Sequence, residues 1–271
     1  MKLSISCRIV ESSKRKDLAA IPIEDFIPKI AKYGFKGISL RASAVSVDST
    51  KDKIKIIKSL IDKYGIKVSM VMGNVDLAAN NENASKCLRN IKPHLDLADS
   101  LNCSIVRIMI KYQEDIKYAQ KSLDEAAERN IFLAQQTHWG TLCETIEQAK
   151  NLVKKINRKN FGITFEPANL IACGENLNLS KIECLLPHIL NCYFQNIKID
   201  SNGKHVFKTF AKGNVNLSYV PFNSNNGIDI KKIIKYFKNI DFGGWITIHQ
   251  PLLTNQNVDD AIMEAKKFFT L

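Results

Sequence analysis

The sequence predicts an α/β protein built as an eight-stranded parallel (β/α)8 TIM barrel, and three observations lead to this prediction. Short apolar segments recur at intervals of about 30 residues, and stretches with helical periodicity separate them. The last four of these segments end in polar side chains, as expected of parallel strands that are buried on both faces and open at their carboxyl ends. The length of 271 residues is usual for one such barrel. We therefore expect a single domain over residues 1–271.

Eight segments have the composition expected of the barrel strands. They are Leu3–Arg8, Gly37–Arg41, Lys67–Met72, Ser104–Ile110, Ile131–Gln136, Gly162–Glu166, Tyr193–Ile199 and Trp245–His249. A barrel gathers the carboxyl ends of its strands over one mouth. Four polar residues in the last four strands could therefore face a common point, namely Gln136, Glu166, Asn196 and His249.

Apolar residues recur at helical spacing between the strands. Phe26, Ile30 and Tyr33 follow the i, i+4, i+7 pattern of one helix face, and Gly34 stands where a glycine would end that helix. Similar stripes fall within 54–64, 95–101, 123–127, 145–153 and 230–237. Helices that alternate with strands in this way are typical of a parallel sheet.

Two longer connections are expected on the mouth side of the barrel. The segment from about 200 to 227 is rich in Asn, Gly and Ser, and we interpret it as an extended loop over the mouth that could act as a lid. A second long loop is expected over Gly73–Asn83.

The charge balance is strongly basic but does not by itself indicate a nucleic-acid partner. The chain has 39 Lys and Arg against 27 Asp and Glu, a net charge of +12. Many lysines lie opposite apolar residues in helical segments such as Lys51–Lys58 and Lys231–Lys238, which is typical of a solvated helix face. No basic segment is interleaved with aromatic residues, so binding to nucleic acid is not expected.

Cysteine usage and hydropathy predict a cytoplasmic protein without a membrane span. Seven cysteines contain no C-x-x-C pair, which favours a reducing compartment over a disulfide framework or zinc ribbon. No apolar run approaches the length of a membrane helix, and the basic start indicates a first strand in place of a signal peptide.

Several segments match, in order, the pattern of a known family. They are Ala31–Leu40 (AKYGFKGISL), Leu97–Arg107 (LADSLNCSIVR), Gln136-Thr-His138, Glu166-Pro-Ala-Asn169, Asn196-Ile-Lys198, Gly227-Ile-Asp229 and Gly244–Gln250 (GWITIHQ). Together they resemble the xylose isomerase-like TIM barrel superfamily of sugar phosphate isomerases and epimerases, which also includes apurinic-type endonucleases. The resemblance covers nearly the whole chain.

The resemblance implies a metal site with substituted ligands. Metal-dependent members hold one divalent ion with Glu, Asp, His and Glu from strands five to eight. The corresponding residues here are Gln136, Glu166, Asn196 and His249. This set carries one carboxylate where the family has three. A divalent metal (Mn, Co, Mg or Zn) could bind it less tightly, and no organic cofactor is expected.

Three residues are candidates for proton transfer. Amide side chains do not titrate near neutral pH, so Gln136 and Asn196 cannot act as general bases. Glu166 and His249 can, and His138 lies two residues beyond Gln136 on the same side of an extended strand. A Glu166/His249 or a His138/His249 pair could form the acid/base couple. Alternatively, His138 caps a neighbouring loop.

Substrate-binding candidates surround these positions. An inward-facing Lys198 could form a Schiff base, bind phosphate, or pair with Glu166. Arginine forks suit a carboxylate or phosphate group, and Trp139 could stack on a sugar ring or serve only in packing. The full candidate set is Lys198, Arg8, Arg41, Arg107, Asn169 and Trp139.

The leading functional hypothesis is an isomerase or epimerase, or a related lyase. It would act on a sugar, sugar phosphate or polyol by proton transfer beside a carbonyl, with a divalent metal as a potential aid. The alternative is a catalytically altered barrel that binds a small molecule or a partner. An apurinic-type endonuclease is a minor alternative, because five histidines and a carboxylate-poor mouth suit its zinc site badly. A sugar-like ligand and a homodimer are the expected partners.

Overall fold

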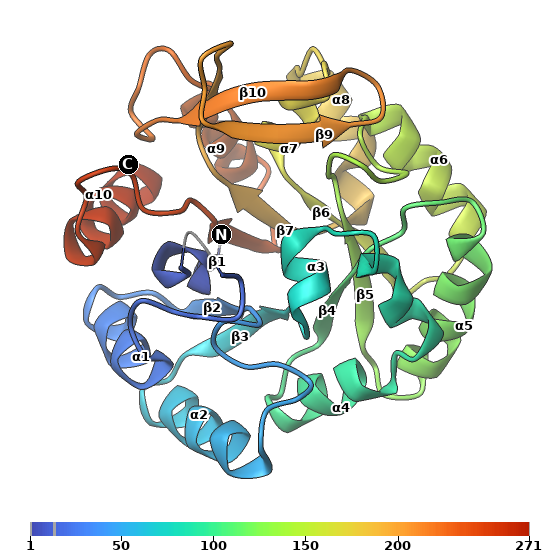
Figure 1. Ribbon diagram of the computed structural model, residues 1–271, viewed down its shortest axis with the longest axis vertical. Helices are drawn as coiled ribbons and strands as arrows, with labels where there is room; N and C mark the ends of the chain where they lie inside the picture. The colour runs from blue at the N-terminus through green and yellow to red at the C-terminus, as the bar shows by residue number, and fades with distance from the viewer. Residues whose placement is uncertain (1, 13–14, 271) are drawn as a thin grey trace.

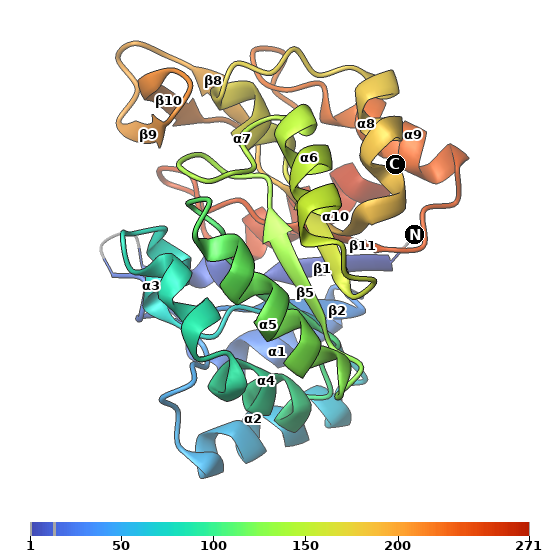
Figure 2. The same cartoon turned by 90° about the vertical axis from the view of Figure 1, so that its right-hand side faces the viewer.

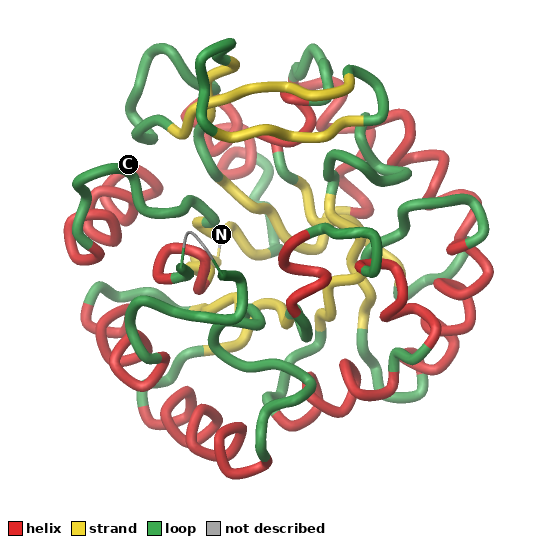
Figure 3. Tube along the Cα trace, viewed as in Figure 1, coloured by secondary structure: helices red, strands yellow, loops and turns green. Residues whose placement is uncertain are grey.

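Eight parallel strands close into a barrel at the centre of the protein, as predicted (Figures 1 and 3). The computed structural model describes residues 2–12 and 15–270. The closed order is β1-β11-β7-β6-β5-β4-β3-β2. The barrel strands are β1 (Lys2–Ser6), β2 (Gly37–Leu40), β3 (Lys67–Val71), β4 (Ile105–Ile108), β5 (Phe132–Gln136), β6 (Phe161–Phe165), β7 (Ile189–Phe194) and β11 (Trp245–Ile248).

Helices surround this barrel as an outer ring (Figure 3). The α-helices are α1 (Ile23–Lys32), α2 (Lys51–Lys63), α3 (Val75–Ala79), α4 (Lys92–Ser100), α5 (Asp115–Ala127), α6 (Ile146–Ile156), α7 (Pro167–Ala172), α8 (Leu179–Leu185), α9 (Ile230–Asn239) and α10 (Val258–Thr270). Short 3-10 helices are η1 (Cys7–Val10), η2 (Ala84–Arg89) and η3 (Leu186–His188). The segment Gly73–Asn83, predicted as a loop, thus contains the short helix α3.

Local sequence signals explain where these helices begin and end. The Thr50 side chain accepts the Lys53 backbone N–H and begins α2, and Thr145 forms a capping box with Gln148 at the start of α6. Gly34 has a φ of 75°, which is the left-handed conformation expected just after α1. The predicted glycine stop is therefore confirmed.

The segment 200–227, predicted as an extended loop, instead contains two strands of a separate sheet. β9 (His205–Thr209) and β10 (Gly213–Tyr219) form an antiparallel hairpin, and β10 also pairs with β8 (Ile197–Ile199). Figure 2 shows α3 and this hairpin on the same side of the barrel, opposite the start of β1. Many residues of the hairpin are exposed and polar, so its sequence lacks the apolar pattern of a buried strand and resembles that of a loop.

The seventh barrel strand lies earlier in the chain than predicted. β7 ends at Phe194, whereas the prediction placed this strand at Tyr193–Ile199. Asn196 therefore lies beyond the barrel strand. Lys198 belongs to β8 and is exposed, so the prediction of an inward-facing Lys198 is wrong.

The barrel interior is partly polar, and several of its polar side chains bind one another. Ser4 Oγ lies 2.7 Å from Ser69 Oγ, and Thr247 Oγ1 donates to Asn191 Oδ1 at 2.7 Å. These hydrogen bonds offset the desolvation cost of the oxygens involved, whereas Asn191 Nδ2 is buried without a hydrogen-bond partner among the described residues. The larger apolar core lies between the strands and the helices. In the part of the chain that the structure describes, no helix is long and apolar enough to cross a membrane.

Candidate functional site

Three of the four strand-end candidates meet at the carboxyl ends of the barrel strands. Gln136 ends β5, Glu166 directly follows β6, and His249 directly follows β11. All three are buried. Glu166 and His249 share Arg8, Arg41 and Arg107 as charged neighbours, which places them at one site.

Glu166 is a buried carboxylate in which one oxygen accepts two hydrogen bonds and the other accepts none. Its Oε2 accepts hydrogen bonds from Gln136 Nε2 and, at 2.8 Å, from Asn169 Nδ2. Its Oε1 is buried and has no hydrogen-bond partner among residues 2–12 and 15–270. Burial raises the pKa of Glu166 to about 7, although the charges of Arg8, Arg107 and Arg41 and the Gln136 hydrogen bond act in the opposite direction.

The His249 imidazole is held in place by an aromatic ring beneath it. It stacks on Tyr193 with ring centroids 3.8 Å apart and ring planes 8° apart, and the Tyr193 hydroxyl lies 2.6 Å from Ser39 Oγ. Burial lowers the pKa of His249 well below its ordinary value, and the charges of Arg8, Arg41 and Arg107 lower it further. His249 is therefore neutral at physiological pH and is a weak base.

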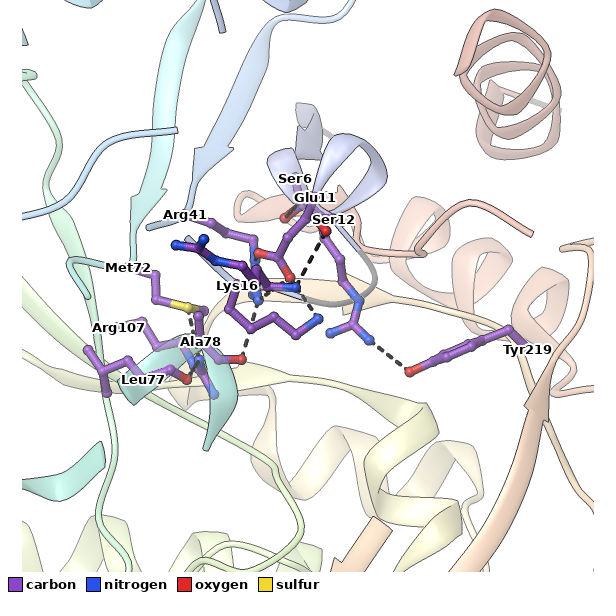
Figure 4. A network of polar contacts seen from close by, with 12 residues as sticks. Ser6, Glu11, Ser12, Lys16, Arg41, Met72, Leu77, Ala78, Arg107 and Tyr219 are labelled. Carbon is purple, nitrogen blue, oxygen red and sulfur yellow. Dashed lines mark hydrogen bonds and ion pairs between the residues drawn. The ribbon is translucent and has the colours of Figure 1, made fainter. Parts of the chain in front are cut away.

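All three predicted arginines act as charged neighbours of Glu166, and Figure 4 shows Arg41 and Arg107 with their contacts. Arg41 forms a two-bond fork with Glu11, through Nε to Oε2 at 2.6 Å and Nη2 to Oε1 at 3.1 Å. Arg8 Nη2 donates to the Tyr219 hydroxyl at 2.7 Å. Arg107 Nη1 donates to the Leu77 carbonyl oxygen at 2.7 Å.

His138 and Trp139 take part in packing at the rim. His138 Nδ1 lies 2.9 Å from the Trp139 carbonyl oxygen and 3.1 Å from Asn80 Nδ2. Trp139 stacks on Phe207 of the β9–β10 hairpin, with ring centroids 5.5 Å apart. Burial lowers the pKa of His138 well below its ordinary value. The structure thus favours the loop-capping alternative for His138 over a role as general base.

Both amide atoms of Asn196 are bound to the backbone. Nδ2 donates to the Pro221 carbonyl oxygen at 2.8 Å, and Oδ1 accepts the Ile228 N–H at 2.7 Å. A side chain on Gly227 would collide with this amide, since its Cβ would lie 2.3 Å from Asn196 Oδ1. Asn196 therefore fixes the segment before α9, and its Oδ1 already accepts a backbone N–H.

Sequence comparison agrees with this architecture. A family model described as xylose isomerase-like TIM barrel matches residues 27–269, which is most of the chain. The chain belongs to the xylose isomerase-like TIM barrel family. Among curated protein sequences, none matches it.

Solved structures of the xylose isomerase-like fold superpose on the whole chain. A probable 3-DHS dehydratase of petrobactin synthesis from Bacillus anthracis has a TM-score of 0.75 at 18% identity, and the match covers 100% of this chain and 99% of that one. A D-allulose 3-epimerase from Methylomonas sp. has a TM-score of 0.70 at 13% identity, with 100% and 97% covered. A Mycobacterium smegmatis barrel in complex with magnesium has a TM-score of 0.67 at 14% identity, with 99% and 94% covered. At these identities the likeness establishes the fold alone.

The residues at this mouth do not fit the divalent metal that the xylose isomerase-like family implies. Of the four corresponding positions, only Glu166 is a carboxylate, and the Asn196 amide is already bound to the backbone. Three guanidinium groups lie near Glu166 and would repel a dication. Within the described residues, no group of three or more His, Cys, Asp or Glu side chains could hold a metal ion.

Three residues of the mouth were not predicted from the sequence. Glu11 carries the carboxylate that Arg41 binds, and its position shortly after the first strand was the available signal. Tyr193 lies within a predicted strand, where alternation could have indicated an inward ring. Tyr219 lies in the segment interpreted as a loop, so nothing in the sequence indicated its contact with Arg8.

Proposed function

We propose that the protein catalyses proton transfer at a carbon beside a carbonyl group of a sugar-like substrate, as an isomerase, an epimerase or a related lyase. One observation carries this proposal, namely Glu166 Oε1, a buried carboxylate oxygen at the carboxyl end of β6 that has no hydrogen-bond partner among the described residues. A carboxyl group whose pKa lies near 7 can both take and return a proton at neutral pH.

The surrounding groups suit the charge that such a reaction develops. When Glu166 Oε1 takes a proton from carbon, the electron pair of the C–H bond moves toward the carbonyl oxygen, which becomes negative. The guanidinium groups of Arg8, Arg41 and Arg107 stabilise negative charge at this site. Return of the proton to the former carbonyl carbon, while the neighbouring hydroxyl proton moves to the former carbonyl oxygen, gives an isomer. Delivery of a solvent proton to the opposite face of the original carbon, with the Glu166 proton released to solvent, gives an epimer. In a lyase reaction the Glu166 proton passes to a hydroxyl group on the next carbon, which leaves as water while a carbon–carbon double bond forms and the carbonyl is restored.

His249 would assist as a neutral hydrogen-bonding group. Its pKa is well below the ordinary value, so a protonated imidazole is disfavoured beside the arginines. We therefore assign the base to Glu166. The stacked Tyr193 ring would keep the His249 plane fixed while the substrate oxygen changes charge.

The test is incorporation of solvent deuterium beside the carbonyl of candidate substrates. The wild type and Glu166→Gln are incubated in D2O with D-fructose, D-fructose 6-phosphate, D-xylulose 5-phosphate and D-glucuronate, and exchange is followed by NMR. We expect exchange with the wild type and its loss by at least about a hundredfold in Glu166→Gln. Exchange that survives in Glu166→Gln would remove Glu166 from the proposed role. Glu128→Gln, on the exposed end of α5, is the matched control.

A binding protein is the second candidate function. The observation in its favour is that only Glu166 is a carboxylate among Gln136, Glu166, Asn196 and His249, so the acid/base pair of metal-dependent family members is incomplete. Saturable binding of one of these compounds without deuterium exchange would favour this candidate. In either case we propose a cytoplasmic location, since all seven cysteines are free and six of them are buried.

A further inference from the structure

The most unusual feature of the mouth is a surplus of buried positive charge. Arg41 and Arg107 are among the largest fully buried side chains of the protein. The charges of Arg8, Arg41 and Arg107 all act on Glu166, yet its carboxylate is hydrogen-bonded by the amides of Gln136 and Asn169. A buried guanidinium group without a counter-ion lowers the stability of the folded protein. We therefore expect an additional anion to bind near these arginines.

Only one of the three arginines is paired with a carboxylate in the described residues. Arg41 and Glu11 form a fork in which both side chains are 1% exposed, and Lys16 Nζ lies 3.0 Å from Glu11 Oε1. Figure 4 shows Arg41 and Lys16 pointing toward Glu11 from different directions. Two oxygens in the plane of a guanidinium fork are the arrangement that a carboxylate or phosphate ligand adopts on arginine.

Each of the other two arginines has an Nε–H group that donates no hydrogen bond within the described residues. Arg8 Nε and Arg107 Nε are buried, and neither has a hydrogen-bond partner within residues 2–12 and 15–270. The partners that Arg107 has at Nη1 are the Leu77 carbonyl oxygen and, at 3.2 Å, the Met72 sulfur, both uncharged. Buried N–H donors are rarely left open in native proteins, which points to an anionic ligand at these atoms.

Glu11 is carried on a segment separate from the barrel strands. It follows η1 and forms an isolated antiparallel bridge with Ala19. The Ser12 N–H donates to the Leu18 carbonyl oxygen at 2.8 Å. Because Glu11 lies outside the barrel strands, rotation of its side chain away from Arg41 would break the fork and the Lys16 contact but no hydrogen bond between barrel strands.

We propose that the Glu11 carboxylate holds the place of an anionic group of the ligand, a carboxylate or a phosphate, and that ligand binding exchanges this group for Glu11 at Arg41. The mouth of this chain would thus receive an anion at Arg41, a charged neighbour of Glu166. The inference rests on the proposed function for the identity of the ligand as a sugar acid or sugar phosphate, but not for the anion site itself.

The exchange predicts that removing the Glu11 charge strengthens anion binding. Thermal unfolding of the wild type and Glu11→Gln is measured with increasing inorganic phosphate, and separately with D-glucuronate, against sodium chloride of equal ionic strength. Glu11→Gln should be less stable than the wild type in chloride, because Arg41 loses its counter-ion. Phosphate or glucuronate should restore that stability with an apparent Kd at least about tenfold lower than for the wild type.

Two further variants make the result specific. Glu175→Gln removes another largely buried carboxylate, which pairs with Lys181 and accepts the Ile146 N–H away from the mouth. It should lose stability without any gain in anion binding. Glu11→Gln combined with Arg41→Gln should lose the anion-dependent stabilisation. If Glu11→Gln does not fold, Glu11→Asp keeps the charge on a shorter side chain and should also bind phosphate more tightly than the wild type.

The inference is overturned if phosphate and glucuronate stabilise the wild type, Glu11→Gln and the double variant equally, because the ions then bind elsewhere on the basic surface. It is also overturned if neither anion stabilises Glu11→Gln or Glu11→Asp more than the wild type. The source of the anion is separated by the two titrations, since a phosphate-selective site prefers phosphate over glucuronate. These measurements need no turnover, so a failure of the proposed catalysis would show only in the deuterium-exchange experiment.

Discussion

At the scale of single residues, two opposing effects determine the pKa of Glu166. Complete burial disfavours its charged form, whereas three arginines and the amide donors of Gln136 and Asn169 favour it. Burial prevails, and the pKa rises from 4.5 to about 7. The ionised Glu166 therefore lowers the stability of the folded protein at neutral pH. A raised pKa of this kind is typical of catalytic carboxyl groups.

This cost should be visible in the stability of Glu166→Gln. A raised folded-state pKa means that the contribution of Glu166 is fully present below pH 4.5 and is lost as the pH rises through about 7. At pH 8 the neutral glutamine should make the variant more stable than the wild type by up to about 3 kcal/mol, and the difference should vanish near pH 4.5. Urea unfolding at both pH values measures it. A variant less stable than the wild type at pH 8 would mean that the arginines outweigh burial.

At the scale of elements, the connection from β7 to α9 depends on Asn196. Its two hydrogen bonds to the Pro221 and Ile228 backbone explain why this position is not a carboxylate or an imidazole free to bind metal. Asn196→Ala should lower the free energy of unfolding by about 2–4 kcal/mol, because a backbone N–H and a backbone C=O lose their partner.

The measurement for Asn196→Ala is thermal and urea unfolding with and without EDTA. The loss should be the same in both conditions, whereas Asn202→Ala, in an exposed turn, should be close to the wild type. A loss that appears only when metal is present would instead restore Asn196 as a metal ligand.

A buried carboxylate, that of Glu144, binds the turn of the β9–β10 hairpin to the loop after β5. Glu144 Oε1 accepts the N–H groups of Gly140 and Phe210, each at 2.6 Å, and Oε2 accepts the Ala211 N–H at 3.0 Å. In Glu144→Gln one acceptor oxygen becomes a donor that faces another N–H. We expect the amides of Phe210 and Ala211 to exchange with solvent deuterium at least about tenfold faster.

Hydrogen exchange followed by mass spectrometry measures this release of the hairpin. The exposed Glu128→Gln variant should leave exchange in the hairpin unchanged. Unaltered exchange in Glu144→Gln would show that the Trp139–Phe207 stacking and the Arg8–Tyr219 hydrogen bond suffice to hold the hairpin.

At the scale of the whole molecule, the mouth is an electropositive site on a fold whose relatives include a magnesium complex. We predict that Mn²⁺, Co²⁺ or Mg²⁺ will not raise the melting temperature of the purified protein, because one carboxylate beside three arginines attracts a dication too weakly. A saturable metal-dependent stabilisation that Glu166→Ala and His249→Ala abolish would contradict the charge argument.

The sequence was sufficient to predict the barrel, but it did not predict most of the contacts between side chains at the site. Buried apolar strands and glycine stops such as Gly34 are local signals, and they predicted the eight-stranded barrel, although the seventh strand was placed too late in the chain. Glu11 and Arg41 lie 30 positions apart and come into contact only in the folded barrel. Their spacing in the sequence therefore does not predict that they pair. The β9–β10 hairpin was missed because its stability comes from tertiary contacts such as Trp139 with Phe207, while its composition is that of a loop.

The most direct test of this account is the titration of the Glu166 carboxyl group. Carbon-13 NMR of protein labelled at the glutamate carboxyl carbons, compared with Glu166→Gln, assigns the signal of Glu166 and follows it with pH. The account predicts a midpoint near pH 7. A carboxyl group that is already fully ionised at pH 5 would contradict it, because Glu166 would then be a fixed counter-ion of the arginines and too weak a base for the proposed proton transfer.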